Sequence, residues 1–96
     1  MFKIYVVYEC KPGKAQEFVK RVTDDGIADA IRNEDGCLQY DYYLKYASDE
    51  VLLIEKWESA DHQKVHMTQP HMAELKKISG ECVSNVTVGK FHTENL

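Results

Sequence analysis

Residues 37–58, CLQYDYYLKYASDEVLLIEKWE, decide the fold of this 96-residue chain. Aromatic and aliphatic residues, which suit the pleated surface of a sheet, recur through Cys37–Tyr46 and again through Glu50–Glu58. Between them, Ala47, Ser48 and Asp49 are small or polar residues typical of a turn. The stretch therefore predicts two antiparallel strands joined as a hairpin.

Counting back from this turn sets a register for the hairpin if Tyr46 pairs with Val51. The pairs that follow on the same face are Leu44 with Leu53, Tyr42 with Glu55, and Tyr40 with Trp57. Cross-strand partners share one face of a sheet, so we expect a single cluster there. Its members are Tyr40, Tyr42, Leu53, Glu55 and Trp57.

Two members of this cluster carry polar groups that need partners. A buried Glu55 carboxylate is costly when it stands alone, so we expect a tyrosine hydroxyl or a histidine to meet it. The indole of Trp57 is suited to walling a cavity, and its N–H needs an acceptor if it is buried. The cluster therefore combines aromatic surface with an acidic group.

Upstream of the hairpin, the pattern predicts a strand and then a helix. Residues Phe2–Cys10 alternate between two faces, which is the period of a strand. A helix is predicted over Lys14–Asn33, with an apolar stripe that slips by five residues between Val22 and Ile27. We expect a kink or bulge at that slip, around Asp24–Gly26.

Downstream, the pattern predicts two short helices and a last strand. Ser59 is a candidate N-cap for a helix over Ala60–Met67. Thr68 is a candidate cap for a second helix, which Gly80 would end. Cys82–Phe91 is predicted to be the final strand.

The order β-α-β-β-α-β predicts a ferredoxin-like α+β fold. Right-handed crossovers then give a four-stranded antiparallel sheet with its helices on one face. The other face would expose apolar side chains, so we predict a homodimer that covers Tyr5, Val7, Leu52 and Ile54. The chain is expected to be one domain over residues 1–96, with a core over about 2–91 and a tail over 92–96.

Composition argues against several classes of partner. The net charge is −4 and the basic residues are scattered, so nucleic acid is not an expected partner. No apolar run approaches the roughly 20 residues that span a bilayer, and the chain begins without a signal-peptide pattern. We therefore expect a cytoplasmic protein that does not bind membranes. Cys10, Cys37 and Cys82 show no CxxC spacing and are expected to be thiols, although Cys10 and Cys82 could be neighbours.

Motifs for covalent or cofactor chemistry are missing from the sequence. There is no GxSxG elbow, phosphate loop or GxGxxG fingerprint, so we expect no bound cofactor. His62 and His66 lie four apart on a predicted helix, a spacing that could hold a divalent metal. The break around Thr68–Pro70 separates His71 from that pair, and surface or packed histidines are the stronger interpretation. We therefore predict no metal site.

His71 has two interpretations. It shares a helical stripe with Leu75 and Ile78, which places an ionisable ring among apolar residues that face the sheet. It is either a core histidine with a satisfied hydrogen bond or a general base at the back of a pocket between helices and sheet.

Several segments together resemble the antibiotic biosynthesis monooxygenase family, and most closely its quinol-oxidising branch. The resemblance runs from about residue 2 to residue 91 and rests on Lys11–Lys14, Glu34–Tyr40, Leu53–Ser59, His66 and Gln69–Met72. It implies a dimeric α+β barrel that acts on a small molecule. It also implies cofactor-independent oxidation of quinols or polyketide aromatics by O₂.

One other branch of the family remains as an alternative, together with a non-enzymatic binding protein of the same fold. Haem-degrading members use an Asn, a Trp and a His; here Trp57 matches, but Val6 and Leu75 stand at the other two positions, which disfavours haem. A branch that processes a phosphorylated signalling sugar shares the spacing of His66 and His71. That activity would need Lys56 or Lys64 to reach the pocket.

On the monooxygenase interpretation, the resemblance and the predicted cluster together suggest roles for individual residues. The base is His71 or His66, and Trp57 walls the pocket and donates a hydrogen bond to a substrate oxygen. The substrate-binding residues are expected to be Val6, Tyr40, Tyr42, Leu53 and Glu55.

Overall fold

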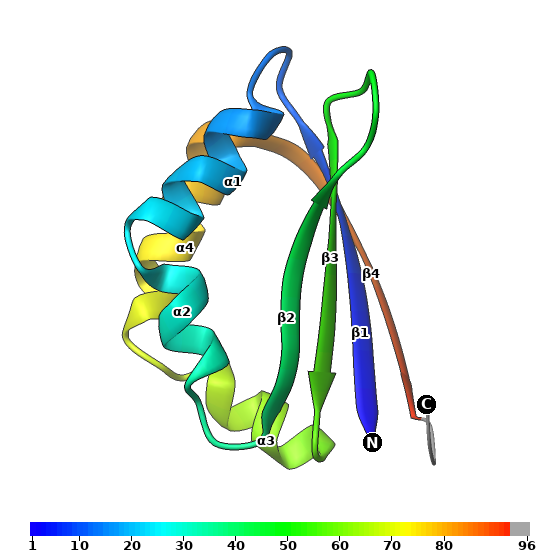
Figure 1. Ribbon diagram of the computed structural model, residues 1–96, viewed down its shortest axis with the longest axis vertical. Coiled ribbons are helices and arrows are strands. Elements are labelled where there is room, and N and C mark those ends of the chain that lie inside the picture. Colours follow the sequence, from blue (N-terminus) through cyan, green and yellow to red (C-terminus); the bar gives the residue numbers. More distant parts are fainter. Residues whose placement is uncertain (93–96) are drawn as a thin grey trace.

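The computed structural model describes residues 1–92 and shows one sheet with all of its helices on one side (Figure 1). The elements in chain order are β1 (Phe2–Cys10), α1 (Ala15–Asp24), α2 (Ile27–Arg32), β2 (Cys37–Leu44), β3 (Glu50–Trp57), α3 (Ala60–His66), α4 (His71–Cys82) and β4 (Val83–His92). The predicted ferredoxin-like α+β fold is confirmed, with each crossover made of two helices. Of the predicted tail, His92 belongs to β4, and residues 93–96 lie outside the described residues.

The sheet has the order β2-β3-β1-β4, and all of its neighbouring strands are antiparallel. The predicted alternation of β1 is confirmed, because its even-numbered side chains from Phe2 to Cys10 are buried beneath the helices. Burial of apolar surface on this side is the main term that stabilises the domain. The core therefore lies between the helical layer and one face of the sheet.

The expected slip in the first helical segment is a complete break. Gly26 has φ = 79°, a left-handed conformation that glycine adopts at little cost, and it separates α1 from α2. The turn lets the apolar stripe start again, so that Val22 and Ile27 are both buried. The segment therefore forms two helices where one kinked helix was predicted.

The predicted register of the β2–β3 hairpin is wrong by two residues. The observed partners are Leu44 with Val51, Tyr42 with Leu53, and Tyr40 with Glu55. The loop is longer than predicted: it spans residues 45–49, Lys45 N–H donates to the Glu50 carbonyl, and Ala47 takes a left-handed conformation. A two-residue shift keeps every side chain on its face, so the predicted aromatic and acidic cluster remains on the helical side.

The two helices after the hairpin confirm one cap and correct two boundaries. The Ser59 hydroxyl caps α3 by accepting a first-turn backbone N–H at 3.2 Å, as predicted. Thr68 does not cap α4, because its hydroxyl donates back to a carbonyl of the preceding turn and Pro70 takes the cap position. Gly80 does not end α4, which continues to Cys82 and stops where Val83 becomes extended.

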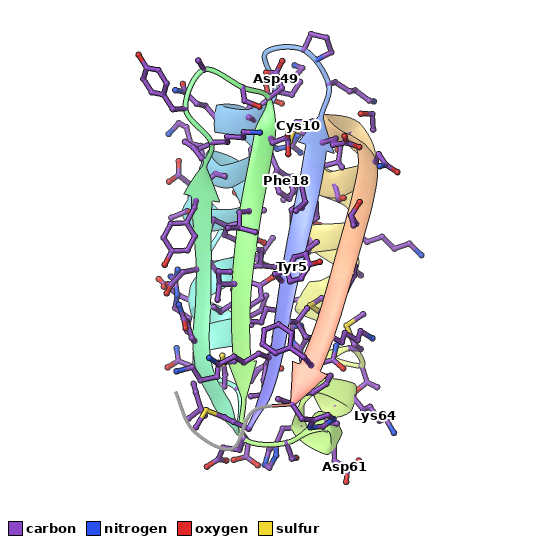
Figure 2. The ribbon with its side chains drawn as sticks, turned by 90° about the vertical axis from the view of Figure 1, so that its right-hand side faces the viewer. Tyr5, Cys10, Phe18, Asp49, Asp61 and Lys64 are labelled. Carbon is purple, nitrogen blue, oxygen red and sulfur yellow. The ribbon has the colours of Figure 1, made fainter. Side chains whose placement is uncertain are left out.

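The face of the sheet away from the helices is open (Figure 2). Tyr5 lies on it, 40% exposed, and its ring crosses the neighbouring strand at Gly89. A Cβ at Gly89 would fall 2.1 Å from the ring, so that close packing requires glycine. Within residues 1–92, no helix combines the length and apolar character needed to cross a membrane.

The cysteines near the upper end of the sheet are neighbours, as the sequence suggested. β1 and β4 pair antiparallel, and the backbone N–H of Lys11 donates to the carbonyl of Cys82 at 2.8 Å. Cys10, Cys37 and Cys82 are all free thiols. Burial is the main cause that raises the pKa of the Cys10 thiol.

Candidate functional site

A cavity of about 210 Å³ opens between the sheet and the junction of α3 with α4. β4 contributes Val86 and Val88, which point toward the helical side and are 44% and 50% exposed. Met67, Met72 and Leu75 close the cavity from the helical side. The pocket is therefore mainly apolar.

Four of the predicted site residues line this cavity and four do not. Val6, Tyr40, Glu55 and His66 contribute to its wall. Among the described residues, the other four lie outside the lining: Tyr42, Leu53, Trp57 and His71. The corrected register accounts for part of this division, because it pairs Glu55 with Tyr40 and moves Trp57 opposite Cys37 at the end of the hairpin.

Glu55 and Trp57 satisfy each other. The indole Nε1–H donates to Glu55 Oε1 at 3.0 Å, and both residues are buried on the same face of β3. The acid therefore meets an indole, where a tyrosine or histidine was expected as its hydrogen-bond partner. Burial raises the pKa of Glu55, and the indole hydrogen bond and the nearby His66 partly oppose that rise.

Two tyrosines beside Glu55 share a hydrogen bond. The hydroxyl groups of Tyr40 and Tyr42 are 3.2 Å apart, and their rings meet edge to face with centroids separated by 5.6 Å. Burial raises the pKa of Tyr42 to about 12 and raises that of Tyr40 well above its ordinary value. Both phenols are therefore protonated at neutral pH and neither serves as a base; in their shared bond one hydroxyl donates and the other accepts.

His66, the last residue of α3, is held on three sides. Its Nδ1 lies 3.0 Å and 3.1 Å from the two carboxylate oxygens of Glu34. One face of the ring packs on the indole of Trp57, with centroids 4.7 Å apart and planes 33° from parallel. The Tyr40 ring approaches edge-on at 6.1 Å. The ring is only 2% exposed, so it has a fixed orientation beside the cavity.

The turn at Thr68–Pro70, between α3 and α4, brings His71 close to His66. The sequence analysis predicted that this turn would separate them. His71 Nε2 lies 2.6 Å from Glu34 Oε2, the same oxygen that His66 approaches. His62 is the histidine that lies apart: its Nδ1 is bonded to the Ser59 hydroxyl, and its Nε2 faces Asp35. The Thr68–Pro70 turn therefore places the start of α4 beside the end of α3, where both histidines reach Glu34.

Glu34 is the site residue that the sequence analysis missed. It stands in the loop after α2 and its side chain is 10% exposed, between two histidines that follow more than thirty residues later. The signal was its place at the start of Glu34–Tyr40, one of the segments that resemble the family. Its acidic type gave no reason to distinguish it from Asp35, which is 95% exposed.

The family of the chain is shown by its match to a family model. The model described as antibiotic biosynthesis monooxygenase matches residues 1–77. The chain belongs to the antibiotic biosynthesis monooxygenase family. The matched range contains Glu34, Glu55, Trp57 and both histidines that contact Glu34. No curated protein matches the chain.

Solved structures share the fold of this family member. A Pseudomonas aeruginosa protein is 19% identical, with 98% of this chain and 94% of that chain covered and a TM-score of 0.84. A Mycobacterium tuberculosis protein is 23% identical, with 99% and 96% covered and a TM-score of 0.81. A structure named antibiotic biosynthesis monooxygenase is 20% identical, with 99% and 100% covered and a TM-score of 0.83. At these identities the likeness establishes the fold.

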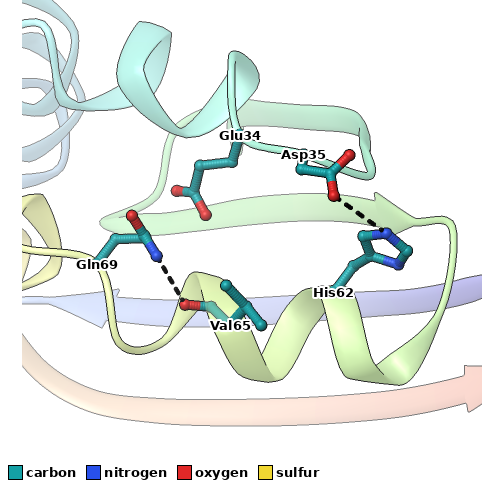
Figure 3. Close-up of a pocket in the computed structure, with 5 residues that line it drawn as sticks. All are labelled: Glu34, Asp35, His62, Val65 and Gln69. Carbon is teal, nitrogen blue, oxygen red and sulfur yellow. Dashed lines mark hydrogen bonds and ion pairs between the residues drawn. The ribbon is translucent and has the colours of Figure 1, made fainter.

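Among residues 1–92 of this family member, two groups of side chains have the residue types of metal ligands. Glu34, His66 and His71 offer ligand atoms within 4.8 Å of one another, as does a second group, Asp35, Glu58 and His62. In the first group, hydrogen bonds to the carboxylate already use one nitrogen of each ring. Figure 3 shows a second pocket, in which Glu34 and Asp35 face His62 and Val65 of α3. Its volume is about 210 Å³.

Proposed function

We propose that this family member is a cofactor-independent monooxygenase that oxidises a small electron-rich aromatic substrate of the quinol type with O₂. The observation that carries the proposal is His66, which lines a mainly apolar cavity while its Nδ1 is bound to a carboxylate. Within residues 1–92, no hydrogen bond occupies its Nε2. That nitrogen is therefore free to act as a general base toward a ligand in the cavity.

The chemistry requires little more than a base and a dry pocket. Nε2 of His66 accepts the phenolic proton, and the electron-rich anion then reduces O₂ itself. One oxygen atom enters the ring and the other leaves as water. The substrate supplies all four electrons, so that a quinol is released as the hydroxylated quinone. Met67, Met72 and Leu75 exclude water from the cavity. Trp57 does not line the cavity but supports its wall, because it donates a hydrogen bond to Glu55 and its ring packs on His66.

The sugar-phosphate alternative has weaker support. It requires positive charge around a phosphate, and among the described residues neither Lys56 nor Lys64 lines the cavity. Lys90 does line it, but its charge is offset by the neighbouring Glu55, with which it interacts. A lone lysine beside a carboxyl group is a poor phosphate site.

Oxygen consumption tests the proposal directly. The pure protein is given a panel of chemically reduced quinones and hydroxyanthrones, and uptake is measured above the uncatalysed rate. We expect uptake that saturates with substrate and that persists after treatment with EDTA. His66→Asn retains a donor toward Glu34 but lacks the base, so turnover should fall by about 10²- to 10⁴-fold.

His62→Asn is the matched control, because His62 lies on the same helix and is not part of the lining of the cavity that His66 borders. It should retain full turnover, and both variants should keep the wild-type circular dichroism spectrum. No uptake with any substrate of the panel would contradict the proposed function, as would a His66→Asn variant of full activity. Loss of activity on chelation would instead indicate a metal-dependent reaction.

A further inference from the structure

The Glu34 carboxylate joins two histidines that come from different helices. Its Oε2 lies 3.0 Å from His66 Nδ1 and 2.6 Å from His71 Nε2, and its Oε1 lies 3.1 Å from His66 Nδ1. A carboxylate accepts hydrogen bonds, so the ring nitrogens that contact it are the donors. When a ring is neutral, its contact therefore selects the tautomer with the proton on that nitrogen.

We propose that Glu34 is the positioning residue that makes His66 a base, by fixing its proton on Nδ1 and leaving the lone pair on Nε2. This inference rests on the proposed function, because it concerns the nitrogen that accepts the substrate proton. Without Glu34, a neutral imidazole can hold its proton on either nitrogen. A ring protonated on Nε2 would present a donor to the cavity and could not accept the substrate proton.

His71 acts through Glu34. Among the described residues it does not line the cavity, and its ring is 24% exposed on the far side of the carboxylate. Its short hydrogen bond to Oε2 fixes the oxygen that His66 also uses. A carboxylate that is only 10% exposed needs such partners, because burial removes most of its hydration. We therefore assign His71 as a second positioning residue, where the sequence offered it as a base.

The arrangement also stabilises the charge that forms during proton transfer. When Nε2 accepts a proton, His66 becomes an imidazolium whose Nδ1–H already points at a negative carboxylate. The contacts with Trp57 and Tyr40 keep the ring from turning away as its charge changes. Base catalysis in other enzymes uses the same division of labour, in which a carboxylate orients the histidine and does not itself take the proton.

Nitrogen NMR of the resting protein tests the tautomer without any substrate. Protein labelled with ¹⁵N-histidine is examined at a pH where His66 is neutral, and the two ring nitrogens are assigned from their couplings to the ring protons. We expect Nδ1 to be protonated and Nε2 to be unprotonated in the wild type. Glu34→Gln should shift the population toward Nε2–H, because the glutamine amide can donate to Nδ1.

Asp35→Asn is the matched control, since it removes the adjacent carboxylate, which faces His62 instead. It should leave the His66 tautomer unchanged. His71→Phe is a second variant that removes the donor to Oε2 but keeps the carboxylate, and it should weaken the preference of His66 without reversing it. A wild-type His66 protonated on Nε2 would overturn the inference, as would a Glu34→Gln variant with the wild-type tautomer.

Kinetics with a substrate that the enzyme accepts supply the second readout. Glu34→Gln should lower kcat by on the order of 10²-fold, while KM changes little because Glu34 lies outside the cavity lining. An unchanged kcat would overturn the positioning role. If the wild type consumes no oxygen, the proposed function fails, and the NMR result still decides separately whether Glu34 fixes the tautomer.

Discussion

Glu55 makes the stability of the protein depend on pH. Burial raises its pKa in the folded state above that of an unfolded glutamate. Between these two pKa values the folded protein still holds the proton and the unfolded chain has lost it, so the free energy of unfolding falls as pH rises through that interval. We predict that urea denaturation will show this fall in the wild type. Glu55→Gln, which can still accept from Trp57, should be less sensitive to pH over the same range.

A comparison of the two proteins isolates Glu55, because all other titrating groups are the same in both. Equal pH profiles for the wild type and Glu55→Gln would show that the carboxyl group does not titrate differently on folding. The need of Glu55 and Trp57 for partners could be predicted from their types and positions. The hydrogen bond between Glu55 and Trp57 could not be predicted. From the sequence, side chains on a neighbouring strand were as plausible a partner for Glu55 as Trp57, which lies two residues along the same strand.

The break between α1 and α2 depends on the conformation of a single glycine. Gly26 has φ = 79°, and a Cβ there would meet no atom within 4 Å, so only backbone strain opposes a side chain. We predict that Gly26→Ala will lower the free energy of unfolding by about 1 kcal/mol. Gly80→Ala is the matched control: Gly80 lies within α4, also with open space, and alanine there should stabilise by roughly 0.5–1 kcal/mol.

Chemical denaturation of both variants measures these opposite signs. If both changes stabilised the protein, the left-handed turn would not constrain the helical layer. This element shows which part of the helical layer was predictable: the five-residue slip in the apolar stripe located the break. The meeting of His66 with His71 was not predictable, because it depends on the direction in which the Thr68–Pro70 turn sends α4. The β2–β3 hairpin was also predictable only in part. The alternation of its residues predicted which side chains share a face of the sheet, but the pairing register depends on the geometry of the loop at residues 45–49.

At the scale of the whole molecule, the face of the sheet away from the helices exposes apolar side chains that no described element covers. Tyr5 and Tyr43 are 40% and 49% exposed there, and Val7 and Leu52 line an apolar hollow of about 320 Å³. The helices already occupy the other face (Figures 1 and 2). Exposed apolar surface of this kind is unusual on a monomer. A second copy of the same sheet would cover it through an isologous interface, in which each protomer offers the same residues.

We therefore predict a homodimer by light scattering at micromolar concentration. Leu52 is central to the face, between Val7 and Tyr43 on the neighbouring strands, so Leu52→Glu would place two like charges near the two-fold axis. The variant should be monomeric, since a stable interface buries about 800 Å² on each partner and cannot accept unpaired buried charges at its centre. Val65→Glu, which adds the same charge at a 59% exposed position on α3, should remain a dimer. A wild-type monomer, or a Leu52→Glu dimer, would show that the open face is not the interface.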